Sequence, residues 1–434
     1  MMTATQQVIE QLRRFESRNV TFLEPDGSWP IVWDRAAGTQ VWDLEGKEYL
    51  DLTAAFGVAA AGHANPRVVA AGQAQMSRLL HAMGDVHPHA LKAQLAARLS
   101  QLTFGRWNQT EGKTVFCNSG FEAVEVALKT ALLATGRRRI LSFAGGYHGL
   151  GYGALNATDR GLFREPFLSQ LGDFGESLLF PANATELDET LTRLKSRLAT
   201  GEIGTVLLEP MQARGGIRIP PPSFLTRLRD ACDEHGALLI LDEIYTGFGR
   251  TGRWFACEHS SVVPDLICLG KALTGGFPLS ACVGRSELMD AAWPRSQGEA
   301  IHTSTFLGHP VGCAMALAQI DELTASNLVQ ESERKGQAAL ESLVSLAQEL
   351  ENSRWTLTAR GCGLFLGLEI TLADGQPGTA MSLSIIKDLL HEGFILLPEG
   401  SAAEVISLTP PLTIHEQDLQ RTLQALEIQL RRYL

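Results

Sequence analysis

The sequence predicts an α/β fold in which helices cover a large, mostly parallel sheet. From about Gly62 to Ala318, short apolar runs alternate with amphipathic helical segments, which is the pattern of such a sheet. Residues 237–241 are apolar throughout, as in a strand buried on both faces. Residues 224–236 before them place their apolar side chains on one helical face and end at Gly236, a typical helix terminator.

Local patterns predict the elements that surround residues 224–241. Residues 38–52 alternate between polar and apolar around a turn and are predicted to form a hairpin. Residues 114–120 are typical of a strand that runs into a glycine turn, and residues 121–133 of the helix after it. Residues 140–143 form a further short apolar run, which predicts another strand of the sheet.

The C-terminal part has a different pattern, because helical segments dominate after about Leu317. The last helix is predicted to start at a capping box formed by Thr413 and Glu416. It then buries one apolar face made of Leu419, Leu423, Leu426 and Leu430. Neither a repeat nor a low-complexity linker divides the chain, so we expect closely packed domains.

Composition excludes several classes of partner. The chain has 434 residues, 45% of them hydrophobic, and a net charge of −11. Such an acidic chain does not favour nucleic acid or an anionic membrane. Seven scattered cysteines, without a CxxC pair or Cys/His cluster, predict reduced thiols and no metal site. The N-terminus lacks a signal-peptide pattern, and no apolar run approaches the ~18 residues that span a bilayer, so we expect a cytoplasmic protein.

Lys271 is the most informative residue, because a short apolar run delivers it into a glycine-rich turn. The segment from Pro264 to Pro278 reads PDLICLGKALTGGFP. Desolvation favours the uncharged amine, and an uncharged lysine forms Schiff bases with carbonyl compounds such as pyridoxal phosphate (PLP). Taken alone, the segment fits equally well a surface lysine after a strand.

Asp242 lies 29 residues before Lys271, directly after the apolar run 237–241. Open α/β sheets bind ligands at the carboxyl ends of their strands. PLP needs an anion beside its ring nitrogen, and Asp242 is placed to supply it. A capping aspartate after a strand is the alternative, but an apolar strand, an acid and a lysine in this order favour the cofactor site.

Six segments carry a resemblance to the class III (ornithine/4-aminobutyrate-type) aminotransferases. They occur in the family's order and are Asn118–Ala123, Tyr147–Gly149, Glu209–Gln212, Asp242–Tyr245, Gly270–Leu273 and Ser304–Phe306. The resemblance implies the PLP-dependent transferase fold of the aspartate aminotransferase type, with a smaller α+β domain beside the large one. It also implies a homodimer with active sites at the subunit interface. We expect an N-terminal segment (1–61) that joins the small domain, a large PLP-binding domain (62–318) and a C-terminal small domain (319–434).

The resemblance also implies cofactor contacts. Backbone N–H groups of Gly120 and Phe121, beside Ser119, would hold the phosphate at a helix N-terminus, although the family usually has a small residue at 121. Tyr147 would stack on one face of the PLP ring and Ile244 would pack on the other. Further contacts are expected from Glu209, Tyr245 (where the family commonly has Gln) and Thr305, which would reach the cofactor of the other subunit.

The substrate pocket departs from the family pattern. Ornithine- and aminobutyrate-type enzymes carry two carboxylate-binding arginines, and here Leu150 and Ser407 stand in their places. Their absence argues against ornithine, acetylornithine or 4-aminobutyrate as substrate. Arg214 is either a relocated carboxylate ligand or a solvated surface arginine, and we expect Phe56 and Met83 to line the side of Leu150.

The sequence therefore predicts a PLP-dependent aminotransferase. It would move an amino group between an amine or amino acid and a keto acid or aldehyde through a Lys271 aldimine, with Asp242 keeping the ring nitrogen protonated. Racemases, epimerases and decarboxylases on the same scaffold are the alternative with the same cofactor. A non-catalytic relative is a third possibility, which Lys271 and Asp242 disfavour.

Overall fold

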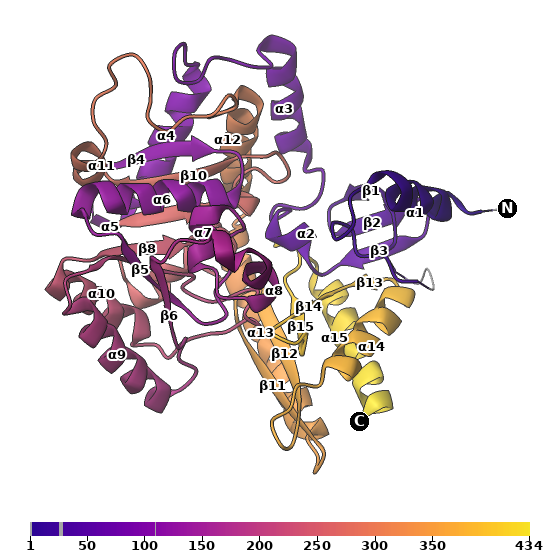
Figure 1. The fold of residues 1–434 in the computed structure, drawn as a ribbon. Helices are drawn as coiled ribbons and strands as arrows, with labels where there is room; N and C mark the ends of the chain where they lie inside the picture. Colours follow the sequence, from indigo (N-terminus) through magenta and orange to yellow (C-terminus); the bar gives the residue numbers. More distant parts are fainter. Residues whose placement is uncertain (1, 26–28, 109) are drawn as a thin grey trace.

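The computed structural model describes residues 2–25, 29–108 and 110–434 (Figure 1). Its centre is a seven-stranded sheet in the order β4-β10-β9-β8-β7-β5-β6. Neighbouring strands run parallel from β9 to β6, whereas β10 is antiparallel to both β9 and β4. The strands are β4 (Gly112–Cys117), β5 (Arg139–Phe143), β6 (Gly175–Leu178), β7 (Ile203–Leu208), β8 (Leu238–Asp242), β9 (Leu266–Leu269) and β10 (Ser280–Arg285).

The apolar strands of this sheet are buried on both faces, as predicted. In β8, Leu239 and Leu241 belong to one hydrophobic cluster and Ile240 belongs to another on the opposite face. The helix before it, α10 (Phe224–His235), ends at Gly236, whose φ of 62° is the left-handed conformation of a helix C-cap. The sequence pattern therefore placed both elements and their boundary.

Helices cover both faces of the central sheet. One face carries α6 (Gly120–Thr135), α7 (Tyr152–Ala157) and α11 (Ser286–Ala292). The other carries α4 (Ala90–Leu102), α9 (Ala184–Leu198) and α10, while α3 (Pro66–Arg78) packs on α12 (Pro310–Ala325). Short helices complete this part of the chain: α5 (Phe104–Asn108), α8 (Gly161–Arg164), η1 (Glu165–Gln170), η2 (Ala256–Ser260) and η3 (Lys271–Leu273).

A second sheet joins the two ends of the chain. Its order is β1-β2-β3-β13, and β13 pairs in parallel with β3, although they lie more than three hundred residues apart. The predicted hairpin at 38–52 corresponds to β2 and β3. Figure 1 shows α2 (Ala54–Gly57) between this sheet and the central one. The remaining elements here are α1 (Ala4–Phe15), β1 (Trp33–Ala37), β2 (Gln40–Asp43), β3 (Glu48–Asp51) and β13 (Phe394–Ile395).

The C-terminal part contains more strand than its sequence pattern predicted, because a third sheet has the order β11-β12-β15-β14. The boundary proposed at 318/319 falls within α12. The elements are α13 (Leu328–Leu350), β11 (Trp355–Cys362), β12 (Phe365–Leu372), α14 (Thr379–His391), β14 (Leu397–Glu399), β15 (Val405–Leu408) and α15 (Glu416–Tyr433).

The predicted capping box of the last helix is wrong. Helix α15 begins at Glu416 with His415 as its N-cap, and no side chain caps it. Thr413 lies in the preceding turn, where its hydroxyl is buried and has no hydrogen-bond partner in the described part of the chain. The extended backbone of His415 (φ −77°, ψ 148°) separates Thr413 from the helix, so the spacing of the motif is present without its geometry.

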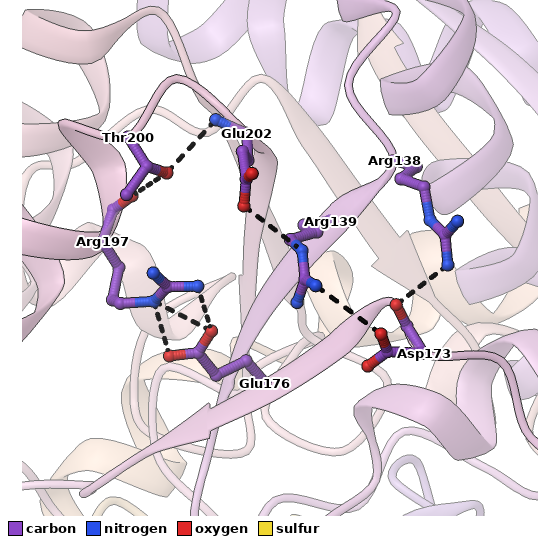
Figure 2. Close-up of polar contacts among 7 residues, drawn as sticks. All are labelled: Arg138, Arg139, Asp173, Glu176, Arg197, Thr200 and Glu202. Carbon is purple, nitrogen blue, oxygen red and sulfur yellow. Dashed lines mark hydrogen bonds and ion pairs between the residues drawn. The ribbon is translucent and has the colours of Figure 1, made fainter.

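Ion pairs tie the amino ends of the parallel strands together (Figure 2). Arg197 of α9 donates to both oxygens of Glu176 on β6, at 2.7–2.9 Å, and Arg139 of β5 lies 3.4 Å from Glu202 and 3.6 Å from Asp173. These side chains are partly exposed, so each pair contributes about 0–1 kcal/mol. They link the amino ends of the strands, whereas the pocket described next lies at the carboxyl ends.

No helix in the described part of the chain is long and apolar enough to cross a membrane. All seven cysteines are free, and six of them are buried.

Candidate active site

The carboxyl ends of the parallel strands open into a cavity of about 610 Å³. Asp242 ends β8, while Lys271, Glu209 and Tyr147 follow β9, β7 and β5. Of the residues predicted to form the site, eleven line this cavity: Phe56, Gly120, Phe121, Tyr147, Leu150, Glu209, Arg214, Asp242, Ile244, Tyr245 and Lys271. Parallel strands thus gather residues from Gly120 to Lys271 in one place.

Lys271 follows β9 through Gly270 and opens the short helix η3. Its φ of 40° is left-handed, which is uncommon for a residue with a side chain. Burial lowers the pKa of its amine, and the carboxylates of Asp242 and Glu209 oppose this effect. Its Nζ lies 4.4 Å from the centre of the Tyr245 ring. The lysine is therefore held with its amine in a desolvated place, as a nucleophile requires.

Asp242 is bound by a residue to which the sequence assigned no role. Nδ1 of the buried His148 lies 2.8 Å from Asp242 Oδ2, and the backbone N–H of Ile244 donates to Oδ1 at 3.1 Å. His148 Nε2 is buried and has no partner among the described residues. These bonds fix the direction of the carboxylate toward the cavity. The Tyr147-His148-Gly149 segment had marked this histidine, but nothing in its sequence names a partner 94 residues away.

The N-terminus of α6 forms a corner suited to a phosphate group. Its first N–H groups, including those of Gly120 and Phe121, have no acceptor within the helix. Ser119 stands before them, and its hydroxyl is buried without a hydrogen-bond partner in the described chain. The backbone N–H of Ser119 donates to Glu122 at 2.8 Å. The Ser119 hydroxyl at the N-cap, the free N–H groups and the positive helix end thus point to one anion position.

Phe121, the departure from the family's small residue, is accommodated by two glycines. A Cβ on Gly149 would lie 2.3 Å from Phe121 Cβ, and one on Gly151 would lie 2.5 Å from its ring. The glycine-rich stretch from 149 to 153 therefore makes room for an aromatic ring. A Cβ on Gly120 would lie 3.0 Å from the side chain of Ile244, so these residues also pack closely.

Glu209 links the loops after β7 and β5. Its carboxylate accepts the backbone N–H groups of Tyr147 and Ala213, each at 3.0 Å. Burial raises the pKa of Glu209, and the nearby Asp242 adds to this effect. The ring of Tyr147 packs edge to face on Phe163 with centroids 5.6 Å apart. Glu209 thereby positions the backbone that carries Tyr147 over the cavity.

Tyr245 lines the cavity with its ring, while its hydroxyl points elsewhere. The hydroxyl lies 3.1 Å from the Thr409 hydroxyl in a buried contact. Burial, chiefly, raises the pKa of Tyr245 to about 12. Within the protein, Thr409 is therefore the hydrogen-bond partner of this hydroxyl.

Arg214 reaches the cavity from the loop after β7 and faces a buried acid. Its Nη1 lies 3.5 Å from Oε1 of Glu399, which is 3% exposed at the end of β14. Burial raises the pKa of Glu399 to about 7, against the lowering by Arg214 and Arg160. Arg160 donates to the backbone oxygens of Arg214 and of Gly400, the latter at 3.0 Å, and so joins the two loops.

Ser407 forms no hydrogen bond with this ion pair among the described residues. Its hydroxyl donates to the backbone oxygen of Leu397 at 2.9 Å between β14 and β15.

Three predicted residues lie outside the lining of this cavity: Ser119 sits directly behind it, whereas Met83 and Thr305 lie on the surface. Phe56 and Leu150 line it and are about half exposed, at 52% and 48%. The described residues contain no group of three or more His, Cys, Asp or Glu side chains that could hold a metal ion. The site is therefore a lysine–carboxylate pocket with an anion corner at one end and apolar side chains at its mouth.

Comparison with known proteins identifies the family. Residues 23–430 match the Aminotransferase class-III family. The chain is 37% identical to an acetylornithine aminotransferase of Methanopyrus kandleri over 93% of this chain and 95% of that one. Among solved structures, it is similar to an amine transaminase of an uncultivated Pseudomonas species in its PLP-bound form (29% identity, TM-score 0.86, 96% and 98% coverage). It is also similar to an (S)-enantioselective omega-transaminase of Thermomicrobium roseum (26% identity, TM-score 0.89, full coverage of both chains).

These matches confirm the fold class predicted from the sequence, and they favour amino transfer over racemisation or decarboxylation. They span nearly the whole chain, including every segment that forms the cavity. The chain belongs to the aminotransferase class-III family and is a PLP-dependent aminotransferase.

Proposed function

We propose that this cavity binds PLP with Lys271 as the point of attachment and Asp242 beside the ring nitrogen. The observation that carries the proposal is the convergence of a desolvated lysine and an oriented carboxylate with the anion corner at Ser119. When bound, PLP supplies an aldehyde that takes up amines and a ring that withdraws electrons from the carbon bearing the amino group.

The remaining contacts follow from the position of each residue around the cavity. Ser119, with the N–H groups of Gly120 and Phe121, would hold the phosphate, while Tyr147 and Ile244 would face the two sides of the ring. Glu209, Tyr245 and Thr305 of the partner subunit complete the proposed set. Lys271 Nζ, whose pKa is lowered by burial, would accept the proton from the donor's carbon and return it as a general acid.

We further propose that the acceptor is a keto acid whose carboxylate pairs with Arg214. A carboxylate in a partly desolvated cavity needs a cation, and Arg214 is the arginine in the lining of this cavity. Phe56, Leu150 and Phe121 present apolar surface, which favours an amine donor with an apolar or neutral far end. Met83 would add to this surface from the subunit interface.

Acetylornithine is a second candidate donor, because the Methanopyrus kandleri relative bears that name and Arg214 offers one carboxylate ligand. The two candidates differ in whether the donor carries a carboxylate. A panel of amines that includes N-acetylornithine, ornithine, 4-aminobutyrate and amines without a carboxylate distinguishes them. A higher kcat/KM for an amine without a carboxylate supports the donor with an apolar or neutral far end. A higher kcat/KM for N-acetylornithine supports acetylornithine as the donor.

Replacing Arg214 with alanine should raise KM for pyruvate about tenfold to a hundredfold, because a charge-assisted pair is lost. Turnover of the amine in a single half-reaction should change much less. Steady-state and single-turnover kinetics measure the two effects separately. Arg218→Ala is the matched control, since Arg218 lies on the same loop but does not line the cavity. Unchanged pyruvate kinetics in Arg214→Ala would show that Arg214 does not bind the carboxylate of the keto acid.

The reciprocal variant Glu399→Gln tests the same assignment. Burial raises the pKa of Glu399 to about 7, so its carboxyl group is mainly protonated below that pH and leaves Arg214 free. Above it, the ionised carboxylate competes with the keto acid. KM for pyruvate should therefore rise as the pH passes 7 in the wild type and stay lower in Glu399→Gln. An equal rise in both proteins would contradict this role for Glu399.

We propose a homodimer in which each subunit completes the other's site. Two exposed apolar segments, 79–86 and 301–306, meet on one surface, where the rings of His81 and Phe306 lie 5.3 Å apart and Thr303 donates to Asp85 at 2.7 Å. Contiguous apolar surface of this kind is typical of a subunit interface. Thr305 is exposed within it.

Free cysteines also support the cytoplasmic location that we predict.

Mixing two inactive variants tests the shared site. Lys271→Ala removes the nucleophile from its own subunit, and Thr305→Arg obstructs the phosphate of the partner's site. In a mixed dimer, one site combines an intact Lys271 with an intact Thr305. Random reassociation should restore about a quarter of wild-type activity. No recovery, despite mixed dimers detected by mass spectrometry, would place Thr305 outside the site.

A further inference from the structure

The chain leaves β3 through a turn with an uncommon backbone. Ala54, Ala55 and Phe56 have φ values of 48°, 48° and 61°, and Gly57 follows at 80°. Residues with side chains rarely adopt this left-handed conformation, and three in succession persist only where neighbouring groups hold them. The conformation of residues 54–57, called here the Phe56 turn, therefore depends on contacts outside it.

Asp51, the last residue of β3, supplies those contacts from a fully buried position. Its Oδ1 accepts the backbone N–H of Thr53 at 2.8 Å and its hydroxyl at 2.6 Å. Its Oδ2 accepts the backbone N–H of Ala55 at 3.1 Å and lies 2.7 Å from His63 Nε2. One carboxylate thus binds Thr53, directly before the turn, and Ala55 within it, and both oxygens are used.

His63 in turn fixes Asp51. The backbone of His63 exchanges two hydrogen bonds with Gly38, at 2.7 and 2.9 Å, and its ring packs on Trp33 with centroids 5.7 Å apart. Trp33 is the first residue of β1, and Gly38 lies in the turn between β1 and β2. The carboxylate that holds the Phe56 turn is therefore oriented by a rigid element and not by solvent.

The Phe56 turn forms part of the wall of the active-site cavity. Phe56 lines the cavity and is 52% exposed. Gly57 packs on the ring of Tyr245, since a Cβ there would lie 3.1 Å from Tyr245 Cε1. The same Tyr245 ring also contacts the lysine, because its centroid lies 4.4 Å from Lys271 Nζ. The turn therefore sets where the Phe56 ring stands relative to the lysine.

We propose that Asp51 is a positioning residue for donor specificity: by holding the Phe56 turn it fixes the Phe56 ring as the surface that receives an aromatic or branched apolar group of the amine. This inference rests on the proposed amine donor with an apolar far end. An aromatic side chain on a rigid support binds an apolar group without first being ordered, so selectivity depends on the support as well as on the ring. A purely structural Asp51 would instead affect stability alone.

The experiment compares Asp51→Asn, Phe56→Ala and the double variant as PLP-loaded enzymes. The probes are 1-phenylethylamine and sec-butylamine, with pyruvate as acceptor. The readout is kcat/KM for 1-phenylethylamine divided by kcat/KM for sec-butylamine. An asparagine amide nitrogen cannot accept a hydrogen bond, so Asp51→Asn leaves one side of the carboxylate network without an acceptor. The ratio should fall about tenfold in Phe56→Ala, a loss of about 1.4 kcal/mol. It should fall in the same direction in Asp51→Asn, and the double variant should equal Phe56→Ala.

Asp43→Asn is the matched control. Asp43 is a buried aspartate of the same sheet that also organises a turn, by accepting N–H groups of Glu45 and Lys47 at 3.0 and 2.8 Å and the Tyr49 hydroxyl at 2.9 Å. Its variant should lower the melting temperature without changing the ratio. Hydrogen exchange of the peptide 50–60 should quicken in Asp51→Asn and stay unchanged in Asp43→Asn. If Asp51→Asn does not fold, His63→Ala, which removes the support of the carboxylate, takes its place.

Two outcomes overturn the inference alone: an unchanged ratio in an active Asp51→Asn whose turn exchanges faster, or a double variant whose loss is the product of the two single losses. If the wild type transfers no amino group from either amine, the proposed apolar donor fails, and the inference fails with it. A selective fall in Asp51→Asn that vanishes in the Phe56→Ala background supports it.

Discussion

Replacing Lys271 with alanine is expected to lower the rate of amino transfer by about 10⁴-fold or more, because we propose that its amine serves as both nucleophile and proton carrier. Alanine keeps the backbone but leaves neither function. Single-turnover kinetics with saturating amine measure the loss. The absorbance of bound PLP should also change, since the cofactor would no longer be attached to the protein.

Lys129→Ala is the control for this experiment. Lys129 lies on α6, where its amine is 3.0 Å from His302 Nδ1 at an exposed position outside the cavity. Its removal should leave the rate within a factor of about two, as surface substitutions usually change little. Activity retained in Lys271→Ala, with the control equally active, would show that another group performs the chemistry.

Replacing Asp242 with alanine is expected to reduce turnover by about 10²–10³-fold, the usual cost of removing one preorganised charged group from a reacting site. The carboxylate is held by His148 and by the Ile244 N–H, so it would meet the ring nitrogen of bound PLP without reorganisation. His148→Ala, which removes only the orienting partner, should cost less than Asp242→Ala. Pre-steady-state rates of the amine half-reaction measure both.

Glu243 provides the matched acid. It is adjacent to Asp242 and fully buried, but its carboxylate turns away to the Thr246 hydroxyl and to the N–H groups of Ala256 and Cys257. Burial raises its pKa to about 7. Glu243→Gln should therefore lower thermal stability while the folded enzyme keeps its turnover. Near-normal turnover in Asp242→Ala would assign the role at the ring nitrogen to another residue.

Local patterns predicted the central sheet well, because its buried strands are runs of apolar residues and the core requires such residues on both faces. The run 237–241 became a strand with alternate residues in separate cores, and Gly236 ended the helix before it. Lys271 and Asp242 follow such strands, so knowing the strands was enough to expect them at one edge of the sheet.

The parts that were missed depend on contacts between distant residues. His148 orients Asp242 across 94 residues, and Glu399 meets Arg214 across 185 residues, separations at which a single sequence gives no pairing signal. The local pattern of the C-terminal part indicated mainly helices, because its strands lie among strong helical segments, and only the family resemblance implied an α+β domain there. The capping box between Thr413 and Glu416 failed because local spacing does not fix the backbone of the turn.

Borohydride reduction followed by peptide mapping tests the central assignment most directly. Reduction makes the linkage between PLP and its lysine permanent, so the labelled peptide identifies the residue without reference to any substrate. We expect a single label on Lys271, in the segment from Pro264 to Pro278. A label on Lys129 or on any other lysine, with Lys271 unmodified, would contradict it.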